Sequence, residues 1–151
     1  MNLITPLLRP ACVVADLDAA SKKHLFELAG TLFEQQHGTP ASEVFDSLFS
    51  REKLGSTALG YGIAIPHGRI KGLKDTACAF FRLETPIDFD APDSLPVDLV
   101  FVLLAPAAAT DLHLQILAEL AQMFSEREMR EKLRAAADTS ELHALIAGWT
   151  P

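Results

Sequence analysis

The stretch VDLVFVLLA, residues 97–105, decides the fold class of this chain, because Leu99–Ala105 within it is the longest apolar run. Pro106 follows the run, whose length suits a β-strand and falls well short of the ~20 apolar residues that a membrane-spanning helix needs. A strand without polar alternation is typical of a sheet that is covered on both faces. Residues 97–105 therefore predict a strand buried on both faces.

The segments before this strand alternate between helical and extended patterns. Apolar residues at helical spacing predict a helix over residues 19–37 and a second one from about residue 40 to residue 53. Residues 63–65 suit a short strand whose pairing ends at Pro66, because proline has no N–H, and residues 76–83 look like a buried strand. Strands interleaved with helices predict an α/β (α+β) sandwich with helices on both faces of the sheet.

The last third of the chain is predicted to be helical. A helix is expected to begin near residue 111, where Thr110 or Asp111 can cap it. Ser125 and Asp138, each followed three residues later by a glutamate, resemble capping boxes that open two shorter helices. The first of these three helices is expected to turn the following residues toward the core: Leu114, Leu117, Ala118, Ala121 and Phe124.

Length, composition and charge limit the function classes. The 151 residues suit one domain, and a hydrophobic fraction of 49% excludes a disordered chain. The 13 Lys and Arg residues against 20 Asp and Glu residues give a net charge of −7, with a sequence pI of about 5.1. Nucleic-acid binding needs a basic face, so this balance argues against nucleic acid as a partner.

The N-terminus and the cysteines indicate a reducing compartment. The sequence opens MNLITP, with no charged segment ahead of an apolar one, so no secretory signal and no direct membrane insertion are expected. Cys12 and Cys78 each lie in an apolar stretch and suit buried, reduced core positions rather than a disulfide or a metal pair. These features predict a cytoplasmic protein.

One of the five histidines has an unusual local context. His67 follows an apolar run and Pro66, and it precedes Gly68, which leaves room for a partner to approach the imidazole. A histidine at a strand exit is held rigidly and can face a cleft, although a structural role fits this position equally well. The other histidines that lie within or at the end of predicted amphipathic helices suit structural or solvated roles: His24, His37 and His143.

His113 is the second candidate. It lies in the first turn of the helix that begins near Asp111, where backbone N–H groups favour an anion. Local context alone favours an exposed surface histidine at this position. Only the fold can bring it together with His67.

A longer pattern surrounds the first candidate histidine: Glu52, then Leu59-Gly60, then IAIPHG at residues 63–68. This spacing resembles the active-site signature of the mannitol/fructose-type enzyme IIA family, EIIA type 2, of the bacterial phosphoenolpyruvate phosphotransferase system. The stretch HLQIL, residues 113–117, matches the position at which the family places a second active-site histidine. The resemblance covers about residues 3–147.

Three other stretches resemble the nitrogen-regulatory branch of this family more narrowly. They are REKLGST at residues 51–57, LETPIDFD at 83–90 and PVDLVF at 96–101. The resemblance implies one EIIA type-2 domain over residues 1–151, similar to the phosphotransferase/anion transport protein fold, with a mixed parallel and antiparallel sheet.

The resemblance also implies the roles of three side chains. His67 would accept a phosphoryl group from HPr or its nitrogen-branch paralogue and form a tele-phosphohistidine. Only a neutral imidazole can do so, because the attacking nitrogen needs its lone pair, and the ordinary histidine pKa of about 6.5 permits this. His113 would stabilise the phosphate, and Arg51 would offset its charge through a bidentate contact, although an exposed helix-end cation fits Arg51 equally well.

Backbone N–H groups of glycine-rich turns can hold phosphate oxygens, so Gly60, Gly62 and Gly68 are candidate phosphate-binding positions. Tyr61 stands between two of them, where relatives often carry a small or polar residue, so it lines the phosphate pocket or the rim of the partner surface. Arg69 is an alternative cation.

Ser56 and Thr57 are candidates for orienting His67, and a simple turn role suits them equally.

Three functions compete. The favoured one is a nitrogen-type regulatory phosphocarrier whose phosphorylation state controls other proteins, such as kinases or transporters. The second is a sugar-transport enzyme IIA that passes the phosphoryl group to a fructose- or mannitol-type permease component. The third is a ligand- or metal-binding module, which the sequence disfavours because zinc needs three or four ligands and no Cys or His cluster has suitable spacing. No cofactor and no metal are expected.

Overall fold

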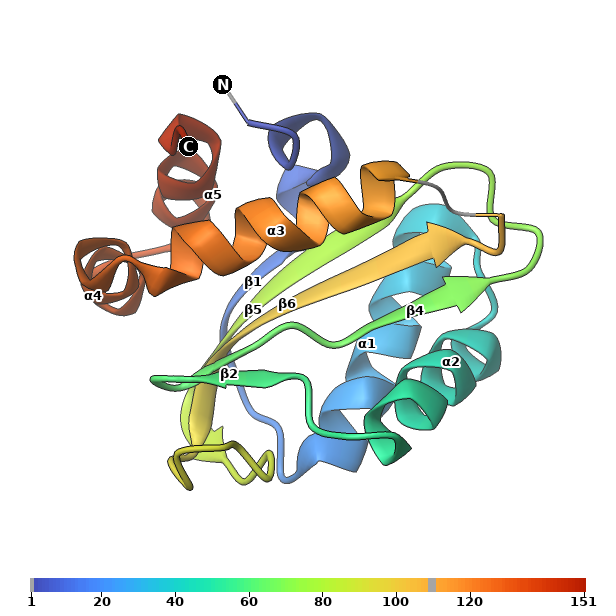
Figure 1. Ribbon diagram of the computed structural model, residues 1–151, viewed down its shortest axis with the longest axis horizontal. Coiled ribbons are helices and arrows are strands. Elements are labelled where there is room, and N and C mark those ends of the chain that lie inside the picture. Colours follow the sequence, from blue (N-terminus) through green and yellow to red (C-terminus); the bar gives the residue numbers. More distant parts are fainter. Residues whose placement is uncertain (1, 109–110) are drawn as a thin grey trace.

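The computed structural model describes residues 2–108 and 111–151, and its centre is one six-stranded mixed sheet (Figure 1). The sheet order is β1-β5-β6-β3-β2, and β4 also pairs with β6. Strand β5 runs antiparallel to β6 and β2 antiparallel to β3, whereas the other pairings are parallel. The strands are β1 (Val13–Leu17), β2 (Ala58–Gly60), β3 (Ile63–Ala64), β4 (His67–Ile70), β5 (Ala77–Ile87) and β6 (Val97–Pro106).

Helices cover the two faces of this sheet, which confirms the predicted sandwich. Helices α1 and α2 lie on one side, and α3 crosses the other side with α4 and α5 beyond it (Figure 1). Two short 3-10 helices, Thr5–Leu7 and Pro10–Cys12, precede β1. The α-helices are α1 (Lys22–His37), α2 (Ala41–Lys53), α3 (Asp111–Ser125), α4 (Arg127–Ala135) and α5 (Thr139–Gly148).

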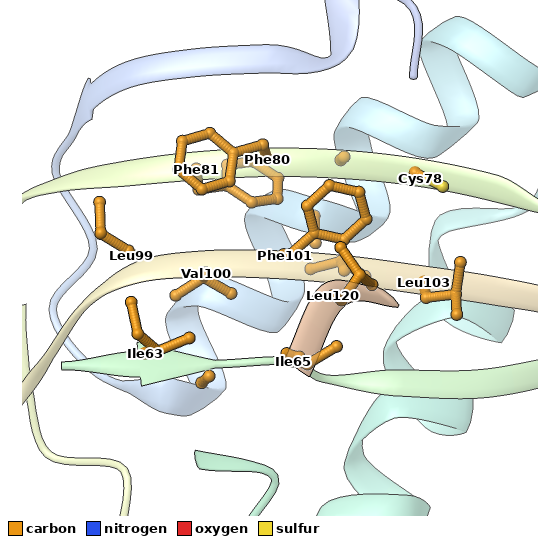
Figure 2. Packing of buried hydrophobic residues seen from close by; sticks show 14 of the residues in the cluster. Ile63, Ile65, Cys78, Phe80, Phe81, Leu99, Val100, Phe101, Leu103 and Leu120 are labelled. Carbon is orange, nitrogen blue, oxygen red and sulfur yellow. The ribbon is translucent and has the colours of Figure 1, made fainter. Parts of the chain in front are cut away.

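The predicted buried strand is confirmed in β6. Every residue from Leu99 to Ala105 is fully buried, because β5 pairs with one edge, β3 and β4 pair with the other, and helices cover both faces. Phe101 shows the packing (Figure 2): its ring centroid lies 6.4 Å from that of Phe80 on β5 and 6.4 Å from that of Phe124 on α3. The burial of both cysteines is also as predicted.

Pro66 interrupts the sheet without ending it, which corrects the prediction for residues 63–65. Ile63 lies opposite Leu99 and His67 lies opposite Leu103, so the register against β6 is the same on both sides of the proline. The Leu103 N–H donates to the carbonyl of Pro66 at 3.0 Å, and pairing resumes at the next residue. His67 is therefore the first residue of a strand, not the exit of one.

The buried face of α3 differs from the predicted one. Leu114 is 64% exposed and Ala118 and Ala121 are also exposed; only Phe124 of the predicted inward set is fully buried. Both stripes of this helix are apolar, so periodicity alone cannot choose between them. The stripe that faces the sheet consists of His113, Ile116, Leu120, Met123 and Phe124.

The helix ends follow prediction in part. Asp138 caps α5 by accepting from the Glu141 N–H at 2.9 Å, as expected. Ser125 does not cap α4, because its hydroxyl donates to the Gln122 carbonyl at 2.6 Å and Glu126 occupies the cap position. The proposed cap at Thr110 lies outside the described residues.

The assignment of the α3 faces is testable by a matched pair of truncations. Leu120→Ala should lower the free energy of unfolding by about 2–5 kcal/mol, because it leaves a cavity between the helix and the sheet. Leu114→Ala should change it by no more than about 0.5 kcal/mol. Urea denaturation followed by circular dichroism measures both, and equal losses would contradict the assignment.

Candidate functional site

His67 is held by the backbone in one tautomer. Its Nδ1 lies 2.8 Å from the carbonyl oxygen of Ile65. A carbonyl oxygen only accepts, so Nδ1 carries the proton and Nε2 keeps its lone pair. The side chain is partly exposed at the start of β4. Nε2 is therefore the nucleophilic atom of this residue.

The surroundings of His67 keep its imidazole neutral. Burial is the main cause that lowers its pKa below the ordinary 6.5, and the charge of Arg51 lowers it further. The hydrogen bond to Ile65 and the charge of Glu52 oppose this shift without cancelling it. A neutral ring at pH 7 follows, and a neutral ring is what a nucleophilic histidine needs.

The structure brings His113 to His67. The two ring centroids are 5.9 Å apart, and His113 is only 7% exposed, so the expectation of a surface histidine is wrong. It points inward because it belongs to the buried stripe of α3. Burial first, and then the neighbouring His67 and Arg69, lower the pKa of His113. Within the described residues its buried Nδ1 has no hydrogen-bond partner.

Two arginines supply positive charge to this pair of rings. Arg51, in the last turn of α2, donates from Nη1 to the Gly55 carbonyl at 2.9 Å and lies near enough to His67 to lower its pKa. Arg69, two residues after His67 on β4, acts in the same way on His113. Two neutral imidazoles flanked by two cations form a site that favours an anion.

The glycines of the β2–β3 turn lie away from the histidines, which corrects their predicted role. The carbonyl of Gly62 accepts from the N–H groups of Asp98 and Leu99 on β6, whereas His67 pairs with Leu103. Four residues along a strand span about 13 Å. Gly60 lies across from Ile63 in the same hairpin, so neither glycine reaches the His67 imidazole.

Tyr61, at the tip of this hairpin, also lies away from the site. Its ring covers the guanidinium of Arg130 on α4, with 4.4 Å from the Arg130 Cζ to the ring centroid. Its backbone adopts a left-handed φ of 56°, held by Asp93, which accepts from its N–H at 2.8 Å. The aromatic side chain therefore packs the hairpin against α4 and does not line the histidine site.

Gly68 adjoins His67 for a different reason from the one predicted. A Cβ at this position would collide with the hydroxyl of Ser47 on α2. The same hydroxyl donates to the Arg69 carbonyl at 2.9 Å and ties α2 to β4. The partner that needs the missing side chain is thus a helix of the protein itself, which approaches the face opposite to the imidazole.

Ser56 and Thr57 differ in their relation to His67. The Ser56 hydroxyl donates to the Phe89 carbonyl at 2.6 Å and has no contact with the imidazole. Thr57 is connected to His67 through one residue, because its carbonyl accepts from the Ile65 N–H at 3.1 Å. Thr57 is therefore in a position to orient His67 indirectly.

Sequence reasoning assigned no role to Glu52, although it begins the quoted pattern. Its side chain is only 4% exposed and pairs with the Lys22 ammonium at 3.0 Å. It also accepts from the Thr57 hydroxyl at 2.6 Å and from the Thr57 N–H at 3.0 Å. An acidic residue at the end of an amphipathic helix looks solvated in the sequence, so nothing in its spacing indicated burial.

Residues 2–108 and 111–151 contain no group of three or more His, Cys, Asp or Glu side chains arranged to hold a metal ion. Within the same described ranges, no helix combines the length and apolar character that crossing a membrane requires.

Comparison with known proteins places this geometry in a family. Residues 6–148 match the family described as phosphoenolpyruvate-dependent sugar phosphotransferase system, EIIA 2. The chain therefore belongs to this family, whose members are components of a phosphotransferase system.

Individual relatives narrow the likeness to its nitrogen-regulatory members. The chain is 40% identical to a nitrogen regulatory protein of Bradyrhizobium diazoefficiens over 144 residues, which are 95% of this chain and 94% of the relative. The crystal structure of nitrogen regulatory protein IIA-Ntr from Neisseria meningitidis is 46% identical and superposes with a TM-score of 0.91 over 96% of this chain and 99% of that one.

The fold is shared more widely. Enzyme IIA-mannitol of Escherichia coli, solved in complex with phosphorylated enzyme IIB-mannitol, superposes with a TM-score of 0.79 at 23% identity, covering 95% of this chain and 100% of that one. This likeness concerns the fold alone.

The electrostatic account of His67 predicts the effect of removing its neighbouring cation. Arg51→Met should raise the pKa of His67, because the guanidinium disfavours a second positive charge beside it. Lys53→Met removes a cation from the same helix end and should leave the pKa of His67 unchanged. NMR titration of the imidazole resonances measures both, and identical curves for wild type and Arg51→Met would contradict the account.

Proposed function

We propose that this protein is a phosphocarrier that accepts a phosphoryl group on Nε2 of His67 from an HPr-like protein and controls other proteins by its phosphorylation state. The observation that carries the proposal is the pairing of two atoms, the protonated Nδ1 of His67 and the carbonyl oxygen of Ile65, at 2.8 Å. This contact leaves Nε2 as an unprotonated nucleophile beside the ring of His113, 5.9 Å away between centroids.

The transfer step follows from this arrangement. The Nε2 lone pair attacks the phosphorus of the donor's phosphohistidine, the donor P–N bond breaks, and the donor imidazole keeps its electron pair. The phosphorylated ring of His67 still carries its Nδ1 proton and gains positive charge. The Ile65 carbonyl then accepts a charge-assisted hydrogen bond, which is stronger than the bond to the neutral ring.

The charged groups around the histidines suit a phosphoryl group. Arg51 and Arg69 offset negative charge on its oxygens, and His113 donates a hydrogen bond to them from a neutral ring. Phosphoryl transfer depends mainly on positioning and charge stabilisation, so these groups supply what the reaction requires.

The regulatory role rests on the relatives. The nitrogen regulatory proteins match 92–97% of the chain at 38–40% identity, as in the proteins of Pseudomonas aeruginosa and Haemophilus influenzae. The expected donor is HPr or its nitrogen-branch paralogue, and the expected targets are proteins such as kinases or transporters. The net charge of −7 favours a donor that is basic around its own active site.

The sugar-transport role remains the second candidate, since a fructose-specific EIIA component of Haloferax volcanii is 38% identical over 102 residues. Such a component would hand the phosphoryl group to an EIIB-type acceptor.

Intact-mass measurement tests the acceptor residue. Incubation of the wild-type chain with phosphoenolpyruvate, enzyme I and an HPr-like carrier should add one acid-labile phosphoryl group. His67→Ala should gain none, because no other side chain offers the nucleophile. His113→Ala should be phosphorylated more slowly but to completion, since the nucleophile is intact.

Circular dichroism of both variants controls for folding. Full phosphorylation of folded His67→Ala would exclude the assigned site, and wild-type rates for His113→Ala would return that residue to a structural role.

The two candidate functions differ in what receives the phosphoryl group. We expect the phosphorylated chain to keep its phosphoryl group when mixed with fructose- or mannitol-type EIIB domains, as befits a regulator. Loss of the added mass from this chain, with its appearance on EIIB within the mixing time, would favour the sugar-transport role.

A further inference from the structure

We infer that Glu52 is a positioning residue for His67, which acts through Thr57 and Ile65 to hold the imidazole in the tautomer that leaves Nε2 unprotonated. The reactive consequence rests on the proposed phosphocarrier function. The tautomer itself can be measured without any phosphoryl transfer.

An unbroken path of hydrogen bonds joins the two side chains. Glu52 accepts from the hydroxyl and the N–H of Thr57 at 2.6 Å and 3.0 Å. The Thr57 carbonyl accepts from the Ile65 N–H at 3.1 Å, and the Ile65 carbonyl accepts from Nδ1 of His67 at 2.8 Å. The carboxylate thus fixes the segment that orients the peptide carrying the acceptor of the imidazole proton.

Burial of this carboxylate needs an explanation beyond an ion pair. Its side chain is 4% exposed, and removing a carboxylate from water is costly unless its oxygens are paired. Lys22 supplies the opposite charge at 3.0 Å and is itself placed over the Phe89 ring at 4.7 Å. An ion pair between α1 and α2 satisfies only part of the carboxylate. The two bonds from Thr57 complete its coordination, and they lead toward the site.

The geometry constrains an equilibrium that is otherwise unfavourable. A free neutral imidazole in water prefers the proton on Nε2, which would block the nucleophile. The Ile65 carbonyl reverses this preference only while it stays within hydrogen-bond reach of Nδ1. A displacement of a few tenths of an ångström in the 57–65 pairing weakens that contact, since hydrogen bonds depend steeply on distance and angle. The charge of Glu52 also opposes the lowering of the His67 pKa.

The test compares matched variants of the full chain without and with phosphoryl donor. Glu52→Gln removes the charge, and Thr57→Val removes the hydroxyl donor while leaving the rest of the chain intact. Thr57→Ser keeps the hydroxyl, and Asp90→Asn alters the other, 82% exposed partner of Lys22, so these two serve as controls. Nitrogen-15 shifts of Nδ1 and Nε2 of His67 report the tautomer in the unphosphorylated protein.

We expect Glu52→Gln and Thr57→Val to raise the fraction of the Nε2–H tautomer and to slow phosphoryl acceptance about 10-fold, as loss of outer hydrogen-bond partners of functional histidines does. Both controls should retain wild-type shifts and rates. Wild-type nitrogen shifts in folded Glu52→Gln and Thr57→Val would overturn the inference and leave Glu52 as a structural anchor. If wild type accepts no phosphoryl group, the proposed function fails while the tautomer measurement still decides the positioning role.

Discussion

Strand β6 carries both the fold and the site, because both of its edges are hydrogen-bonded and both of its faces are covered. On one edge it pairs with β5, and on the other with β3 and β4 in an unchanged register. Pro66 lies in the gap between the latter two strands. The register keeps His67 at a defined height on the sheet, while the proline removes one N–H from the ladder and opens space for a side chain to turn toward α3.

Neutrality at the centre and charge at the rim describe the electrostatics of the site. Burial lowers the pKa of both histidines, and the arginines reinforce this shift. A dianionic group placed between the rings gains from the same cations that keep the rings unprotonated. Glu52 counterbalances part of this positive charge, and its own charge is compensated by Lys22. A protein that is acidic overall thus keeps a locally cationic site.

Local patterns predicted most of the frame. The buried strand at residues 97–105 and the helices now called α1 and α2 followed from runs and periods long enough to be unambiguous. The same reasoning failed where two answers were locally equivalent. Helix α3 has two apolar stripes, so the sheet and not the period selected the one that contains His113. Gly60 and Gly62 had the composition of a phosphate-binding turn, and pairing placed them in a hairpin about 13 Å along the sheet from His67.

The sequence by itself determined the family pattern, the candidate histidines and the mixed character of the layers, because these depend on residue type and spacing along the chain. Only the tertiary structure decided that His113 is buried against His67 and that Tyr61 belongs to the α4 contact. It also showed that a buried Glu52 leads to the imidazole through Thr57 and Ile65. The physical reason is that burial, tautomer and pKa depend on groups distant in sequence, which chain spacing cannot specify.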